Sequence, residues 1–158
     1  MLQRVDPAPT LGVGREGCEV AEEWVEKLSN WLVSAGFEQV DKELDGPFGD
    51  VLIEFKGAAC EVIVGREKLQ WYVGIAPRGG DPVMLPKVWA SLLDGTEPDA
   101  GNADPLERQL AFVYQRLGEV EEAVERDSEV GVKLLAVNRR LIRARLGLDP
   151  EVPRPGSP

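Results

Sequence analysis

Three consecutive runs in which apolar and polar residues alternate constrain the fold of this chain more than any other feature. They cover residues 51–56, 60–64 and 69–75. Side chains of a β-strand point to its two faces in turn, so a period of two residues indicates a strand with one buried face. The segments between the runs are short enough for hairpin loops. We therefore expect a three-stranded antiparallel meander, to which residues 37–40 could add a fourth strand.

Helical periodicity precedes and follows this meander. Residues 17–35 place apolar side chains three or four positions apart, and Gly36 supplies a stop signal. A short helix is expected within residues 82–94, beginning at or near Leu85 because the next residue is a proline. Two longer helical segments follow. This order predicts an α+β fold with an N-terminal helix, the meander, and then helices that include a long C-terminal pair.

The first helix of that pair carries a heptad stripe, formed by Leu106, Leu110, Val113, Leu117, Val120 and Val124. Asp104 is the expected N-cap of this helix, and Ser128 is the expected N-cap of the helix that runs to about Leu146. A stripe of this kind either packs on the chain's own sheet or forms the seam of a coiled coil. A homodimer through helix 106–126 is therefore one of the open alternatives.

Length and composition indicate a single globular domain. The chain has 158 residues, of which 43% are apolar. We assign the domain to residues 17–147, and we expect residues 1–16 to be a flexible arm and the proline-rich residues 148–158 to be a disordered tail. No export signal is recognised, and no run approaches the roughly 18 apolar residues that span a bilayer. A cytoplasmic protein without a membrane partner is expected.

The charged residues exclude several kinds of chemistry. The chain has 28 acidic and 18 basic residues and no histidine, which gives a formal charge of -10. Without histidine there is no Ser–His or Cys–His nucleophile pair and no histidine metal site. Phosphate repels so acidic a chain, so nucleic acid is not expected as the main partner. Cys18 and Cys60 are expected to be reduced, and we predict no catalytic residue, metal or cofactor.

Charge is segregated along the sequence. Glutamates line the first helix without a basic residue among them until Lys27, and acidic residues cluster at residues 119–129 of the helical pair, relieved only by Arg126. By contrast, residues 130–148 contain basic residues and no acidic one. The basic stripe is expected on a solvated helix face, or paired with the acidic helix across a hairpin or dimer seam. Trp71 and Tyr72 are adjacent in a strand, so one of these two aromatic side chains must leave the core face.

These features favour a non-enzymatic module that binds a basic protein partner. Carboxylates would steer the association, and an exposed aromatic side chain would anchor its centre. The residues predicted to contact the partner are Glu16, Glu19, Glu22, Glu23, Asp45, Asp50, Glu54 and Tyr72.

Residues 24–77 resemble small bacterial immunity proteins of polymorphic toxin systems. The resemblance consists of a helix that ends in Gly36–Phe37, an acidic turn from Gly46 to Asp50, the strand VLIEFKG and the hairpin EVIVGREKLQWYVGIAP. It implies a stoichiometric inhibitor that binds and blocks a cognate toxin or nuclease. No individual binding residue follows from it.

Two other classes of function remain open. The chain could be a structural or adaptor protein of a larger bacterial assembly that associates through the heptad helix. It could also be an enzyme that uses carboxylates alone, with Asp45 and Asp50 or Glu54 and Glu61 as the candidate pairs, or it could hold a ligand between sheet and helices.

Overall fold

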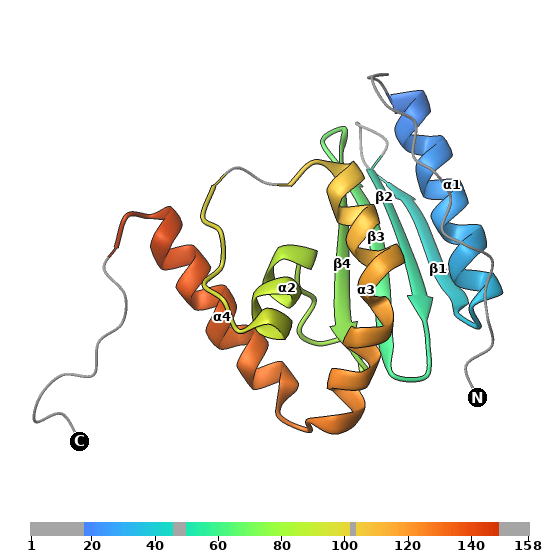
Figure 1. The fold of residues 1–158 in the computed structure, drawn as a ribbon. Coiled ribbons are helices and arrows are strands. Elements are labelled where there is room, and N and C mark those ends of the chain that lie inside the picture. Colours follow the sequence, from blue (N-terminus) through green and yellow to red (C-terminus); the bar gives the residue numbers. More distant parts are fainter. Residues whose placement is uncertain (1–17, 46–49, 102–103, 149–158) are drawn as a thin grey trace, which may run out of the picture.

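The computed structural model describes residues 18–45, 50–101 and 104–148 and confirms the α+β fold (Figure 1). The predicted arm at residues 1–16 and nearly all of the predicted tail lie outside the described residues. The elements are α1 (Cys18–Ser34), β1 (Glu38–Asp45), β2 (Asp50–Lys56), β3 (Cys60–Glu67), β4 (Gln70–Pro77), α2 (Pro86–Asp94), α3 (Leu106–Arg126) and α4 (Val130–Arg145).

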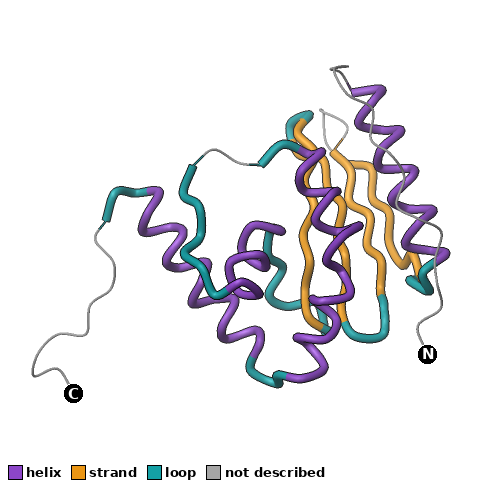
Figure 2. The backbone as a smooth tube through the Cα atoms, viewed as in Figure 1, coloured by secondary structure: helices purple, strands orange, loops and turns teal. Residues whose placement is uncertain are grey.

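The strands form one four-stranded antiparallel sheet in the order β1-β2-β3-β4. The fourth strand considered for residues 37–40 is present as β1, and it continues to Asp45. A register shift between Gln39 and Asp41 interrupts its pairing with β2. Figure 2 shows the strands side by side, with β1 and β4 at the two edges.

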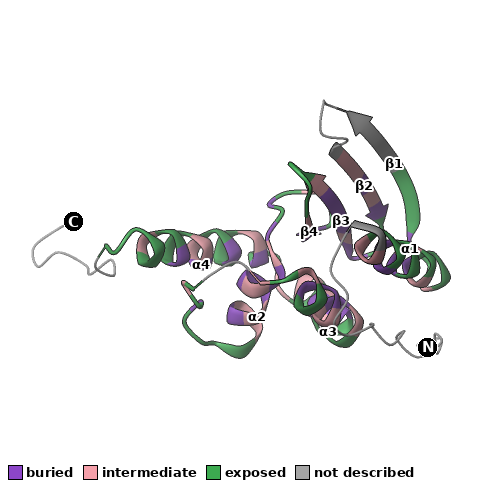
Figure 3. Cartoon of the chain, turned by 90° about the horizontal axis from the view of Figure 1, so that it is seen from above, coloured by how far each residue is buried: buried purple, intermediate pink, exposed green. Residues whose placement is uncertain are grey.

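One face of the sheet forms the core. Phe55, Val62, Val64, Val73 and Ile75 are fully buried there, because the register aligns the alternate residues of β2, β3 and β4. Helices α1 and α3 cover this face (Figure 3), and they contribute buried residues such as Leu28, Leu32, Leu110 and Val113. The period of two residues in the strands therefore accounts for this apolar layer.

The opposite face of the sheet carries no helix within the described part of the chain (Figure 3). The register places Leu52, Glu54 and Lys56 of β2 on it, next to Glu61, Ile63, Gly65 and Glu67 of β3 and to Gln70, Tyr72 and Gly74 of β4. We call this surface the open sheet face.

Met84 and helix α2 cover the β4 edge at Ile75. The main chains of Ile75 and Met84 exchange two hydrogen bonds of 2.9 Å. The Trp89 indole Nε1 donates a third hydrogen bond to the Ile75 carbonyl, at 2.8 Å, and Trp89 is fully buried. The segment after β4 thus acts as a short extra partner for an edge that would otherwise be free to pair with another chain.

The heptad stripe of α3 packs inside its own chain. Leu110, Val113, Leu117 and Val120 are all buried in the core. Of the two alternatives for this stripe, packing on the parent core is the one found, so its central residues are not available for the seam of a dimer. Within the described residues, no helix is long and apolar enough to cross a bilayer.

The caps of the last two helices differ from the prediction. Pro105, not Asp104, is the N-cap of α3, and Glu129, not Ser128, is that of α4; neither cap makes a side-chain hydrogen bond. Asp127 stabilises the connection instead, since its Oδ1 accepts a 2.9 Å hydrogen bond from the Glu129 backbone N–H. A carboxylate at this turn satisfies a backbone donor that the expected serine cap does not.

Candidate functional site

On the open sheet face, an aromatic side chain of the edge strand β4 packs over a glycine of β3. Tyr72 lies opposite Gly65 in the register, and a Cβ built at Gly65 would lie 2.2 Å from the Tyr72 ring. Any larger residue at position 65 would displace the ring. Gly65 is thus needed for close packing, and it lets Tyr72 lie flat over β3 while its side chain remains partly exposed.

Carboxylates lie on the same face of the sheet as this ring. Glu54 and Glu61 are partly exposed and Glu67 is exposed, and Lys56 is the basic side chain among them on β2. Glu54 is paired with Ile63, which is buried, and Ile63 is paired in turn with Gly74, against which Val83 packs. The face therefore combines a partly exposed aromatic ring with negative charge, a combination suited to the recognition of basic groups.

The structure brings Glu54 and Tyr72, both predicted contact residues, onto one surface. Glu61 and Glu67 lie on it as well, and the prediction of partner-contacting residues omitted them. The register pairs Asp45 with Asp50 at one end of the β1–β2 ladder. The side chains of these two aspartates are outside the described part of the structure, as is that of Glu19 and the whole of Glu16.

The glutamates of α1 do not belong to this surface. Helix α1 covers the core face, so Glu22 and Glu23 are on the other side of the sheet (Figure 3). Glu22 Oε1 accepts a 3.3 Å hydrogen bond from Arg66 Nη1. The predicted contact residues Glu22 and Glu23 therefore lie on a different surface from Glu54 and Tyr72.

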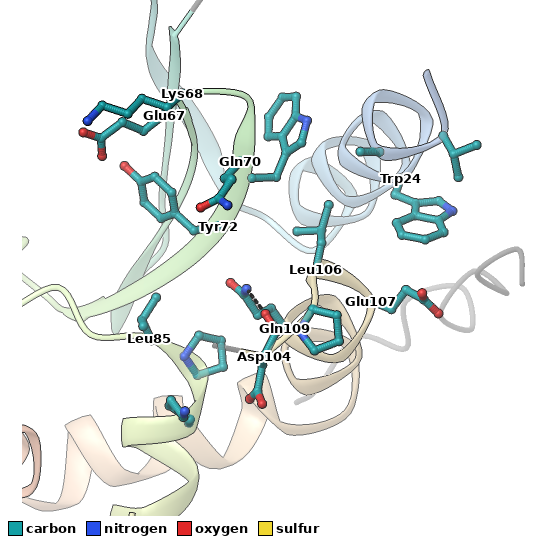
Figure 4. Close-up of a pocket in the computed structure, with 16 residues that line it drawn as sticks. Trp24, Glu67, Lys68, Gln70, Tyr72, Leu85, Asp104, Leu106, Glu107 and Gln109 are labelled. Carbon is teal, nitrogen blue, oxygen red and sulfur yellow. Dashed lines mark hydrogen bonds between the residues drawn. The ribbon is translucent and has the colours of Figure 1, made fainter. Parts of the chain in front are cut away.

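A cleft of about 720 Å³ opens beside the sheet, where four segments meet (Figure 4). It is lined by the start of α1, the β3–β4 hairpin, the start of α2 and the start of α3. Trp24, Trp71, Tyr72, Leu85 and Leu106 supply apolar surface. The charged lining residues are Glu67, Lys68, Lys87, Asp104 and Glu107. Tyr72 and Glu67 belong to both the cleft and the open sheet face.

The side chain of Gln109 connects two walls of this cleft (Figure 4). Its Oε1 accepts a 2.7 Å hydrogen bond from the Val73 backbone N–H, and its Nε2 donates a 2.8 Å hydrogen bond to the Asp104 carbonyl. The buried primary amide thus replaces a peptide group beside β4 and fixes the start of α3 against the strand.

Trp71 separates the cleft from a smaller groove of about 490 Å³ between α1 and the sheet. Its indole Nε1 is buried without a hydrogen-bond partner, and the Arg66 guanidinium lies 5.3 Å from the ring centroid. The ring therefore gains from a cation–π contact but leaves one polar group unsatisfied.

The hairpin at the rim of the cleft has an unusual backbone. Lys68 and Leu69 have φ values of 50° and 68°, in the left-handed region that favours glycine or asparagine. The Leu69 side chain is 57% exposed at this tip. An exposed leucine in a strained turn stabilises neither the turn nor the core.

Burial raises the pKa of two titratable groups near the core. Burial, with a smaller effect of Glu121 and Glu61, raises the pKa of the Cys60 thiol to about 12. Such a thiol is un-ionised at neutral pH and is a poor nucleophile. Burial also raises the pKa of Glu121, and Glu125 adds to the effect. Among the described residues, no three Cys, Asp or Glu side chains gather in an arrangement that could hold a metal ion.

Comparison with known protein families, with curated proteins and with solved structures gave no match to this chain.

Proposed function

We propose that the chain is a non-enzymatic protein-binding module that receives a basic partner on its open sheet face. The observation that supports this function best is the composition of that face. Glu54, Glu61 and Glu67 share this face with the partly exposed ring of Tyr72. A rigid sheet holds these groups in fixed positions, which reduces the entropy lost on binding.

The size of the face sets a requirement on the partner. Four strands of seven or eight residues present about 500 Å² on one side. A stable complex buries about 800 Å² on each partner. The partner must therefore extend past the sheet, and the β3–β4 tip with the exposed Leu69 offers the adjoining surface. Contact of Leu69 with the proposed partner would explain why a leucine occupies this unfavourable turn.

More specifically, we propose that the module is a cytoplasmic immunity-type inhibitor that neutralises a basic toxin or nuclease. The pattern of residues 24–77 and the acidic surface support this more specific function. The alternative is an adaptor of a larger assembly. Because Leu110, Val113 and Leu117 are buried in the chain's own core, self-association through that stripe is the less favoured version of the adaptor.

Site-specific photocrosslinking tests the location of the interface. A benzophenone side chain is introduced at Leu52 on the open sheet face, and separately at Gln115, an exposed residue of α3. In lysate of the native cell, we expect the Leu52 probe to form an adduct with a basic protein that the Gln115 probe does not form. Adducts from position 115 alone would place the interface elsewhere.

A further inference from the structure

The backbone of the β4 edge finds its hydrogen-bond partners within the chain itself. The Val73 N–H donates to Gln109 Oε1 at 2.7 Å, and the main chain of Ile75 exchanges two 2.9 Å hydrogen bonds with Met84. The Ile75 carbonyl also accepts the hydrogen bond from the Trp89 indole. Because alternate residues of an edge strand direct their backbone groups outward, Val73 and Ile75 are satisfied without a further strand.

The β1 edge differs from the β4 edge. Within the described residues, β1 has a neighbouring strand on one side only, and helix α1 contacts it from the core face of the sheet (Figure 3). After the register shift near its start, β1 pairs regularly with β2 from Asp41 to Asp45. The outer side of this regular run presents backbone donors and acceptors in the spacing that another strand requires.

The composition of β1 determines which kind of strand fits there. Its sequence, EQVDKELD, contains four acidic residues and one basic residue, so the strand has a formal charge of -3. A second copy of β1 would bring two such strands to within about 5 Å of each other, and the repulsion of like charges opposes that pairing. Charged edges of this kind prevent indiscriminate pairing in natural sheets, whereas an incoming strand rich in lysine or arginine is attracted to them.

We infer that the outer edge of β1 accepts a basic β-strand from another protein and so extends the sheet to five strands. Backbone hydrogen bonds supply the affinity in this mode of recognition, and the charge of β1 supplies the selectivity for a basic strand. The inference is separate from the function proposed for the open sheet face, because it uses the backbone edge of β1 and no side chain of that face.

The test uses the full chain and three synthetic β-hairpin peptides, which are cyclised so that the strand is formed before it binds. The edge strand of the first peptide alternates lysine and threonine, and the second peptide has glutamate in place of lysine. The third is the lysine peptide with N-methyl groups on the outward amides of that strand, which keep the charge and remove the backbone donors. Fluorescence anisotropy should detect saturable binding of the lysine peptide and at least tenfold weaker binding of the other two.

Amide hydrogen exchange of the original chain locates the contact. Saturation with the lysine peptide should slow the exchange of alternate amides within residues 41–45 by at least tenfold, because strand addition bonds the outward amides only. The amides of Val73 and Ile75 already have partners and should exchange as before. Glu43→Lys, which reverses one charge of β1, should weaken the lysine peptide by at least threefold at an unchanged thermal midpoint.

Glu122→Lys is the matched control, because it makes the same change of charge at an exposed position of α3. This variant should bind the lysine peptide as the original chain does. The inference is overturned if the lysine peptide does not bind, if the N-methylated peptide binds equally well, or if the slowed amides lie outside β1. It is also overturned if sedimentation shows a dimer in which the β1 amides are already protected, since a second copy would then cover the edge.

Discussion

Gln109 is the residue on which the docking of α3 against β4 depends most. Replacement by leucine keeps the volume but leaves the Val73 N–H and the Asp104 carbonyl without their partners. We expect Gln109→Leu to lower the free energy of unfolding by about 1–3 kcal/mol. Denaturant unfolding measures the change, and Gln115→Leu at an exposed position of the same helix should leave stability within about 0.5 kcal/mol.

Replacement of Leu69 is expected to raise the free energy of unfolding, in contrast to replacement of Gln109. A leucine with φ of 68° is strained, and glycine is not. We expect Leu69→Gly to raise the free energy of unfolding by about 0.5–1 kcal/mol, after the larger entropy of the unfolded glycine chain is subtracted. If the tip contacts the partner, the same variant should weaken binding. A variant that is less stable than the original chain would refute the strain at this turn.

The raised pKa of Glu121 predicts that the stability of the fold depends on pH. Its raised pKa means that the folded state disfavours the ionised carboxylate relative to the unfolded state. The resulting destabilisation is absent below the ordinary value of 4.5 and fully present above the raised pKa. Glu121→Gln should therefore show a modestly higher thermal midpoint at pH 7, and the difference should vanish as the pH falls below about 4.5.

Glu122→Gln, at the exposed neighbouring position, serves as the control and should show no such gain. Scanning calorimetry between pH 4 and 8 makes the comparison. An advantage of Glu121→Gln that persists unchanged at the acid end would show that its cause is not the charge.

Among the elements, α2 depends on a single side chain for its position on the sheet edge. Trp89→Phe removes the hydrogen bond to the Ile75 carbonyl and leaves a small cavity. The expected loss is about 1–3 kcal/mol of unfolding free energy. Trp31→Phe is a matched change, because the Trp31 indole N–H is buried without a partner, and it should cost distinctly less. Equal losses in urea unfolding would contradict the role of the bond.

The strands show what the sequence could predict and what it could not. Residues 51–56 alternate cleanly, and they form β2 as expected. The sequence of β1, EQVDKELD, gives a much weaker signal, because a register shift breaks its alternation and its pairing with β2 stabilises it. Local pattern does not encode such pairing, so the prediction extended only to residues 37–40.

The candidate site was predictable only in part for the same reason. Alternation alone places Glu54 and Tyr72 opposite the core-facing residues of their strands. Their proximity to Glu61 and Glu67 depends on the register of two hairpins. The cleft depends on four segments that are distant in sequence, and it includes Gln109, a polar residue next to an apolar stripe that no short motif distinguishes.

At the scale of the whole molecule, acidic and basic surfaces are kept apart. The open sheet face carries carboxylates and Tyr72, whereas the basic helix α4 packs on α2 and extends away from the sheet (Figure 3). At physiological ionic strength, exposed charges more than about 8 Å apart are largely screened from each other. Charges on α4 should therefore have little influence on a basic partner bound at the open sheet face.

The affinity of the crosslinked basic partner for charge-neutralised variants tests this account most directly. Titration calorimetry at low and at high salt would compare Glu54→Gln/Glu61→Gln/Glu67→Gln with the control Glu122→Gln/Glu125→Gln/Glu129→Gln, which changes as many exposed charges elsewhere. We predict that the first set weakens binding by about tenfold at low salt and less at high salt, and that the control has little effect. Equal affinity for both sets at low salt would contradict recognition through the open sheet face.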